Sequence, residues 1–426
     1  MNAIKKTDYH KTKIACYMGF ITQAIAANFA PLLFLKFHSD YHISLGNIAL
    51  ISTFFFFTQL LVDLFCAKFV DHIGYRVCII ASEIFSALGL LGLAFLPDFL
   101  PDPFIGIICS VIVYAIGSGL IEVLCSPIIE ACPFENKEAT MSLLHSFYCW
   151  GQVGVVLITT LLLRLIGEDL WFIIPILWSL LPLYNLFRFL KVPLMPTVPE
   201  EEKTPLKTLF TSKIFLVALL LMLCAGASEL AMSQWSSLFA ERALGVTKVI
   251  GDLLGPCLFA VFMGIGRTIY GVWGEKIHLT GAMVFCAALC ILCYLGTALF
   301  ENPWLSLLSC ALCGFSVSLM WPGTFSLTSA AYPKGGTAMF GILAVLGDVG
   351  CSVGPALMGA VSGAVSGNAK IAASFPNLTA DQLGLKSGML FSSVFPAFIL
   401  IGVLLLTRFH KAANKKPSPK ADLSEE

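Results

Sequence analysis

The stretch Gly151-Gln152-Val153-Gly154 decides the fold, because it recurs as Gly347-Asp348-Val349-Gly350 in the second half of the chain. Each copy lies inside a long apolar run, residues 141–166 in one half and residues 338–365 in the other. A match of four residues is weak alone. It gains weight when further matches follow in the same order.

A second pair of matches precedes the first in both halves. Gly119 stands eight residues before Pro127, and Gly314 stands eight residues before Pro322. Internal similarity in a constant order is the signature of a repeated structural unit. The sequence therefore predicts two copies of one unit, joined near the middle of the chain.

Composition places these units in a membrane. The chain has 426 residues, of which 58% are hydrophobic and 12% are charged, whereas a soluble domain has about 25% charged residues. The mean hydropathy is +0.86. These values exclude a soluble enzyme, a nucleic-acid binder and a disordered scaffold, and the zero net charge predicts no polyanionic partner. We expect a multi-pass membrane protein, monomeric, without enzymatic activity.

Apolar runs of about 20 residues are long enough to span a bilayer as helices. The predicted fold class is all-α membrane: twelve transmembrane helices in two pseudo-symmetric six-helix bundles, over residues 1–190 and 214–410. The predicted spans are 14–35, 48–69, 77–96, 104–129, 141–166, 170–190, 214–239, 249–273, 279–300, 304–331, 338–365 and 388–407.

The positive charges predict the orientation of the chain. With an even number of spans both termini share one side, and 20 of the 26 Lys and Arg residues fall on that side. The positive-inside rule places it in the cytoplasm of a cell whose plasma membrane the chain spans. Residues 191–213 form a polar, proline-rich cytoplasmic linker, and residues 411–426 are predicted to be a disordered cytoplasmic tail.

Four cysteines have a spacing that also occurs in zinc sites. The pairs Cys290–Cys293 and Cys310–Cys313 are separated by 16 residues. Both pairs lie in apolar runs of lipid-spanning length, where cysteine behaves as a small hydrophobic residue. We predict no metal and no cofactor.

Several motifs resemble one known family. The loop Ala67 to Arg76, with Asp71 and Gly74, resembles the major facilitator superfamily signature Gly-x-x-x-Asp-Arg-x-Gly-Arg-Arg. Residues 121–127, 143–147, 264–267 and 322–327 resemble the fucose permease branch of that superfamily, the fucose/galactose/glucose–proton symporters.

This resemblance implies a major facilitator fold, sugar transport and a proton gradient as the driving force. Two positions depart from the branch. Ala30 stands where the family has an aspartate before Pro-Leu-Leu, which removes one of two proton-carrying carboxylates, and Ser126 replaces an asparagine.

Ionisable residues inside the spans are the candidate functional groups, because a charge at mid-membrane is costly unless it is paired, hydrated or neutralised. We predict that Glu122 carries protons, with Glu229 or Asp348 replacing the acid missing at Ala30. Asp63 and Arg267 occupy equivalent repeat positions, so they either pair as a cytoplasmic gate or make separate local contacts. The predicted cytoplasmic gate residues are Asp63, Asp71, Arg76, Arg267 and Glu275.

Polar and aromatic residues at mid-span are candidates for solute binding. Carboxylates and amides suit sugar hydroxyls, and tryptophan rings suit the apolar face of a pyranose. For His145, Trp235 and Trp321 the sequence also leaves open a purely structural role, in which the side chain packs against its neighbours and binds no solute. The predicted substrate-binding residues are Gln23, Asn28, Glu122, His145, Gln152, Gln234, Trp235 and Trp321.

Together these observations favour a secondary active transporter. A duplicated bundle with its site at the repeat interface is the architecture of such proteins. We expect it to move a small polar solute, a sugar in the favoured reading, by alternating access and with proton coupling. An uncoupled facilitator, an exporter of a non-sugar amphipathic solute and, more remotely, a non-transporting membrane sensor remain as alternatives.

Overall fold

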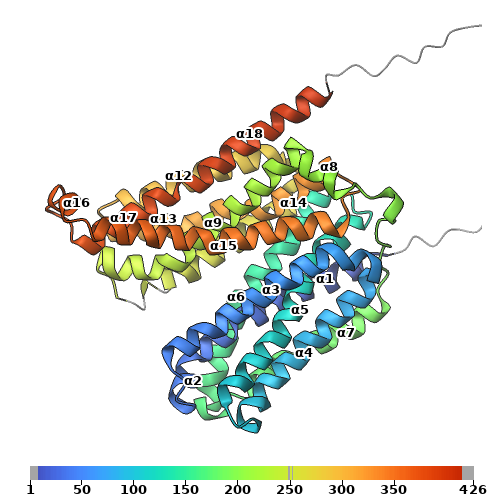
Figure 1. Cartoon of the computed structure of the whole chain (residues 1–426), viewed down its shortest axis with the longest axis horizontal. Helices are drawn as coiled ribbons and strands as arrows, with labels where there is room; N and C mark the ends of the chain where they lie inside the picture. The colour runs from blue at the N-terminus through green and yellow to red at the C-terminus, as the bar shows by residue number, and fades with distance from the viewer. Residues whose placement is uncertain (1–7, 248–249, 252, 415–426) are drawn as a thin grey trace, which may run out of the picture.

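The computed structural model describes residues 8–247, 250, 251 and 253–414, and within these ranges the chain is helical and contains no strand. Figure 1 shows the helices as two bundles, the earlier one blue to green and the later one green to red. Among the described residues, twelve helical segments are long and apolar enough to cross a membrane. The prediction of an all-helical, twelve-span fold is therefore confirmed.

The earlier bundle contains the first six spans. Its elements are α1 (His10–Asn28), η1 (Ala30–Leu33), α2 (Phe34–Asp40), α3 (Leu45–Ile73), α4 (Tyr75–Phe99), α5 (Pro103–Ala131), α6 (Lys137–Ile166), η2 (Glu168–Leu170) and α7 (Ile173–Lys191). The segment that follows contains two short helices, η3 (Glu200–Glu202) and α8 (Leu206–Thr211).

The later bundle contains the other six spans. Its elements are α9 (Lys213–Leu244), η4 (Leu253–Cys257), α11 (Leu258–Trp273), η5 (Gly274–Lys276), α12 (Leu279–Leu299), α13 (Pro303–Val317), α14 (Met320–Ala331), α15 (Gly336–Ser366), α16 (Ala369–Ala373), α17 (Ala380–Ser392) and α18 (Val394–Asn414). Helix α18 thus extends into the segment predicted as a tail. Residues 415–426 of that prediction lie outside the described residues.

Local sequence explains why equivalent helices begin where they do. Asp102 caps α5 by accepting a hydrogen bond from the Phe104 backbone N–H, and Pro103 follows at the first helical position. Asn302 caps α13 in the same way, again with proline as the next residue. A polar cap followed by proline satisfies the free N–H groups that a helix end would otherwise expose near lipid.

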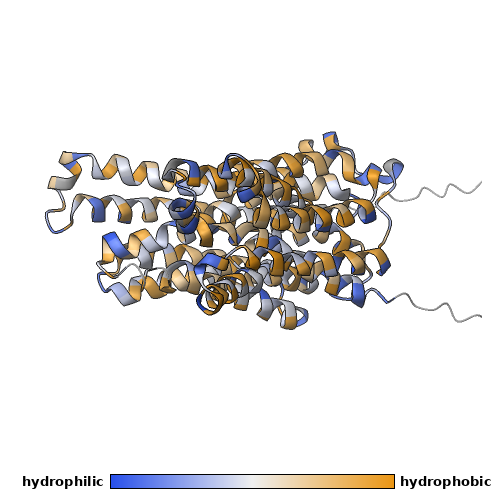
Figure 2. Ribbon diagram, turned by 90° about the horizontal axis from the view of Figure 1, so that it is seen from below, coloured by the Kyte–Doolittle hydropathy of each residue, from blue (hydrophilic) through white to orange (hydrophobic). Residues whose placement is uncertain are grey.

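The two bundles repeat the same packing. Helices α1 and α6 pack together in the earlier bundle as α9 and α15 do in the later one, and the α4–α5 pair corresponds to α12–α13. The bundles meet through two equivalent contacts, α3 against α15 and α6 against α11. Figure 2 shows that apolar residues cover most of the helix lengths, as spans require.

The bundles touch at one end and diverge at the other. Both ends of the described chain lie at the touching end, on the right of Figure 1, which we call the terminal end. There Tyr270 donates a hydrogen bond to Glu138 across the interface, 3.0 Å between oxygens. The backbone N–H of Thr204 in the linker also donates to the carbonyl of Lys334, at 2.9 Å. Polar links and close helix contacts therefore hold this end shut.

Small residues let the helices approach closely at the terminal end. A Cβ on Gly341 of α15 would lie 3.1 Å from the Cβ of Ala67 and 3.2 Å from its backbone nitrogen. Such a position has no room for a larger side chain, because interior packing leaves few voids. Gly363, near the other end of α15, faces open space instead.

We therefore expect Gly341→Leu to force α3 and α15 apart. Overpacking of this kind lowers the free energy of unfolding by about 1–3 kcal/mol, so the melting temperature in detergent should fall. Gly363→Leu makes the same substitution in the same helix without a clash, and should melt near the wild type. Equal melting temperatures for the two variants would contradict the close contact.

Candidate functional site

Glu122 lies at the centre of a small hydrogen-bond network formed by side chains of the earlier bundle. Its Oε2 accepts a hydrogen bond from Nε2 of Gln23 on α1 at 2.8 Å and from Nε2 of Gln59 on α3 at 2.5 Å. Ser118, one turn before Glu122 on α5, donates to Oε1 of Gln59 at 3.2 Å and so orients that amide. Three helices thus converge on one carboxyl oxygen.

Three further carboxyl groups lie around Glu122. Asp348 of α15 and Glu229 of α9 come from the later bundle, are partly exposed, and act electrostatically on Glu122. Asp63 of α3 is fully buried and interacts with Asp348 and Glu122. We call Asp63, Glu122, Glu229 and Asp348 the carboxyl cluster. It combines acids from both bundles at their interface.

Arg267 is the cation of this region and joins the two bundles. Its Nη2 lies 3.4 Å from Oε2 of Glu229. Its Nε donates to the Ser318 carbonyl at 3.1 Å, and its Nη1 donates to the His145 carbonyl of the earlier bundle at 3.2 Å. The Arg267 side chain is 4% exposed, so these partners replace the water that a buried charge requires.

Aromatic rings from both bundles pack next to the cluster, toward the terminal end. The ring of His145 lies 4.8 Å from Phe20 and 5.8 Å from Phe325, measured between centroids. Phe325 continues the layer to Phe340, at 5.3 Å. His145 Nε2 also lies 3.4 Å from the hydroxyl oxygen of Ser126. The structure places His145 in this buried layer, without a direct hydrogen bond to Glu122.

The other residues predicted to bind substrate differ in their exposure and in their position relative to the carboxyl cluster. Trp321 is 9% exposed and packs over Gly347, where a Cβ would overlap its ring, so it lies beside Asp348. Asn28 and Gln152 are partly exposed, and Asn28 donates to the carbonyl of Ala24 at 2.9 Å. Gln234 is exposed.

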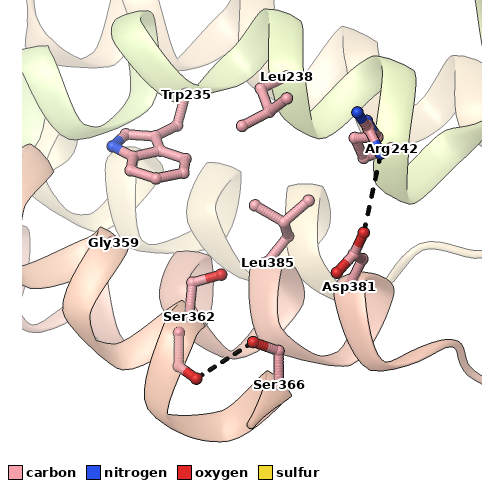
Figure 3. Close-up of a pocket in the computed structure, with 9 residues that line it drawn as sticks. Trp235, Leu238, Arg242, Gly359, Ser362, Ser366, Asp381 and Leu385 are labelled. Atoms are coloured by element: carbon pink, nitrogen blue, oxygen red, sulfur yellow. Dashed lines mark hydrogen bonds and ion pairs between the residues drawn. The ribbon is translucent and has the colours of Figure 1, made fainter.

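Trp235 lies away from the carboxyl cluster, in a cavity of about 420 Å³ between α9, α15 and α17. Figure 3 shows its ring above Ser362, with Arg242 and Asp381 at the far side. The indole N–H donates to the carbonyl of Pro355 at 3.1 Å. This cavity is separate from the network around Glu122, so the structure does not bring Trp235 together with Gln23 or Glu122.

The contacts of Asp63 and Arg267 distinguish the two alternatives that the sequence left open for these residues. Asp63 and Arg267 are not paired: Asp63 faces Asp348, and Arg267 binds Glu229. The structure therefore favours the separate-contact alternative for these two residues.

At the terminal end, Asp71 binds Lys203 of the linker at 3.2 Å and accepts a hydrogen bond from Thr337 of α15 at 2.5 Å. Arg76 donates instead to carbonyl groups at the end of α7, including that of Phe189 at 2.6 Å. Glu275 is exposed. Of these three, Asp71 is the residue that links the bundles.

The cysteine pairs pack within the later bundle. Cys290 on α12 and Cys313 on α13 are buried, with their sulfur atoms 3.7 Å apart. They belong to the main apolar core of that bundle, which is the environment that their sequence context indicates.

Gln59 is the functional candidate that sequence reasoning missed. The sequence does contain a pattern that points to Gln59. It stands one helical turn before Asp63 in an apolar run, and residues four apart share a helix face. Its importance depends on α5 packing against α3, which places Glu122 opposite that face.

Solved structures of similar fold include two sugar:proton symporters. A crystal structure of FucP, a major facilitator superfamily transporter, in the outward conformation matches with a TM-score of 0.75 at 16% identity, covering 93% of this chain and 99% of that one. A structure of the E. coli fucose:proton symporter FucP gives 0.74 at 16%, with the same coverage. The proton:xylose symporter XylE, bound to 6-bromo-6-deoxy-D-glucose, gives 0.74 at 13%, covering 94% and 95%.

At these identities the likeness shows the fold alone. No curated protein matches the chain by sequence. The family model described as Major Facilitator Superfamily, however, matches residues 15–355, which is most of the chain. The chain therefore belongs to the major facilitator superfamily, and is a multi-pass membrane transporter rather than an enzyme.

Proposed function

We propose that this transporter couples the movement of a sugar to the movement of protons across the plasma membrane. The observation that carries the proposal is the carboxyl of Glu122, bound by the amides of Gln23 and Gln59 at the interface between the bundles. The structural neighbours named as fucose:proton and proton:xylose symporters favour the same substrate class and coupling ion.

The network around Glu122 provides the groups that a sugar requires. Amide N–H groups donate to hydroxyl oxygens, and carboxylate oxygens accept from hydroxyl groups, so the pair recognises neighbouring hydroxyls on a ring. The Trp321 ring, beside Asp348, offers an aromatic surface to the C–H face of a pyranose. The solute would replace the bonds that these side chains make with one another.

Protonation of Glu122 provides a link between the proton and the solute. As a carboxylate, Glu122 accepts both amides through one oxygen, and charge-assisted hydrogen bonds of this kind are strong. A neutral carboxyl accepts them more weakly, which releases the amides of Gln23 and Gln59 for the solute. Proton binding and solute binding therefore favour each other, as symport requires.

The carboxyl cluster itself favours a proton as the coupling ion. Four carboxylates with one guanidinium carry three uncompensated negative charges in a mostly buried site, which is costly. Glu229 has Arg267 as its partner, whereas Glu122 has neutral amides. Binding of a proton is the simplest way to reduce this charge without a metal or a new side chain.

The distribution of positive charge indicates which side of the membrane the terminal end faces. We place the terminal end in the cytoplasm, since 20 of 26 Lys and Arg residues fall on the predicted terminal side. The bundles then diverge toward the outside, and we propose that solute enters from that side. Alternating access would follow when the terminal end opens and the other end closes.

Glu122→Gln tests the coupling. In proteoliposomes with an inward acid gradient, the variant should lose sugar accumulation and retain exchange of sugar across the membrane, because an amide cannot carry the proton. Glu83→Gln is the matched control, since Glu83 is also a buried acid but binds Asn185 inside the earlier bundle. Unchanged accumulation by Glu122→Gln would exclude it as the proton carrier.

A panel of sugars tests the substrate class. Thermal melting of the purified protein should rise with one or more monosaccharides, and Gln59→Ala should weaken that binding roughly 2- to 13-fold, since a hydrogen bond between neutral groups contributes about 0.5–1.5 kcal/mol.

Gln382→Ala is the control for this panel, because Gln382 makes its hydrogen bonds in the capping box of α17 and with the carbonyl of Ala243. Stabilisation by amphipathic non-sugar compounds, and by none of the sugars, would contradict the proposed substrate class.

A further inference from the structure

Asp63 and Asp348 face each other across the interface between the bundles. The helices α3 and α15 run in opposite directions and touch where Ala67 meets Gly341. At about 1.5 Å rise per residue, Asp63 lies about 6 Å, Asp348 about 10 Å and Gln59 about 12 Å beyond that contact. Asp348 is therefore level with the space between Asp63 and Gln59, and its carboxyl interacts with both.

Asp63 has no donor to neutralise it among the described residues. It is fully buried, and neither of its carboxyl oxygens receives a hydrogen bond from a described donor. The nearby cation Arg267 is already bound to Glu229 and to two backbone carbonyls. An unpaired buried carboxylate is costly, so this arrangement requires a partner that the protein's donors do not supply.

The groups around the pair are acidic or neutral. Glu122 approaches from α5 and Glu229 from α9, while α3 adds the Cys66 thiol and α15 adds the Cys351 thiol. Helix α14 presents the Trp321 ring to α15. On α17 the acid Asp381 has Arg242 as its partner, at 4.0 Å. None of these groups places a cation against Asp63.

We propose that Asp63 and Asp348 share one proton, and that this proton fastens α3 to α15. A carboxyl O–H from one residue then donates to the carboxylate of the other, which is a short, strong type of hydrogen bond. Without the proton two negative charges face each other in a buried place and repel. The same two side chains therefore attract or repel according to whether one proton is bound.

This shared-proton site lies on the interface that must separate when the terminal end opens. Asp348 is partly exposed, so it takes the proton from hydronium on the diverging side, leaving water. When the helices separate, the carboxyl returns the proton to water on the terminal side. Bound, the proton keeps the terminal end closed; its loss favours opening. The inference rests on the proposed function for the direction of proton flow, but uses a site separate from Glu122.

The sign of the pH dependence follows from proton counting. The closed state binds one proton at this pair more firmly than the open state, in which the carboxyls are apart and hydrated. Closure is therefore favoured at low pH and is lost as pH rises. Couplings of this kind change an equilibrium by roughly 5-fold or more.

Hydrogen exchange at the terminal end measures this closure. The Thr204 amide, bonded to the Lys334 carbonyl, connects the linker to the later bundle, and Lys203 beside it binds Asp71 of α3. After correction for intrinsic exchange, the wild-type peptide that contains Thr204 should exchange roughly 5-fold or more faster at pH 8 than at pH 5.5. Glu83→Gln, a buried acid away from the interface, should behave as the wild type does.

Asp63→Asn replaces the shared proton with a permanent amide donor. It should make exchange slow at both pH values, and Asp348→Asn, at a partly exposed position that tolerates substitution more easily, should do the same. A wild-type rate independent of pH, or a full pH response in both variants, would overturn the proposal.

Glu122→Gln separates this inference from the proposed function. It should abolish accumulation and keep the pH response of the Thr204 peptide. A pH response that disappears in Glu122→Gln would assign it to Glu122 and overturn the shared-proton site, while accumulation that persists would contradict the coupling role of Glu122 alone.

Discussion

The cost of placing charge inside a bilayer determines how this transporter is built. Each of the helices α3, α5, α9 and α15 carries one carboxyl group at mid-span, and a carboxylate there is stable only with a partner, with water or with a proton. The structure brings all four to the interface between the bundles, where the helices diverge. Glu122 binds amide groups, Glu229 binds a guanidinium, and Asp63 and Asp348 face each other.

Two kinds of contact lie at or near the closed terminal end, close packing of small residues and contacts between ionisable side chains. Small residues such as Gly341 and Ala67 let backbones touch, and this packing is independent of charge. In the shared-proton proposal Asp63 and Asp348, next to that contact, respond to protons, because their attraction and repulsion depend on ionisation. Asp71 and Lys203 add an ion pair between α3 and the linker. Packing therefore sets where the bundles meet, and under the shared-proton proposal the acids make that contact sensitive to protons.

The fold could be predicted from the sequence because a membrane span is a local property. Twenty apolar residues define a helix without knowledge of its neighbours, and the repeat from Gly151 to Gly347 relates the two bundles. Glu122 could be singled out as a candidate functional residue for a similar reason, since an acid within an apolar run is conspicuous.

Partners between helices could not be predicted in this way. The repeat relates Asp63 to Arg267 by symmetry, but it does not say which residue each one faces across the interface. Gln59 was missed because its role depends on the contact between α3 and α5. His145 and Trp235 were conspicuous in sequence, yet rotation of their helices places them in an aromatic layer and in a separate cavity.

The most direct test of the account follows protons themselves. Addition of a transported sugar to proteoliposomes in weakly buffered medium, without an imposed gradient, should make the outside medium more alkaline as protons enter with the sugar. The wild type should produce this alkalinisation, and Glu122→Gln should produce none. Sugar entry by the wild type without any change in external pH would contradict proton coupling.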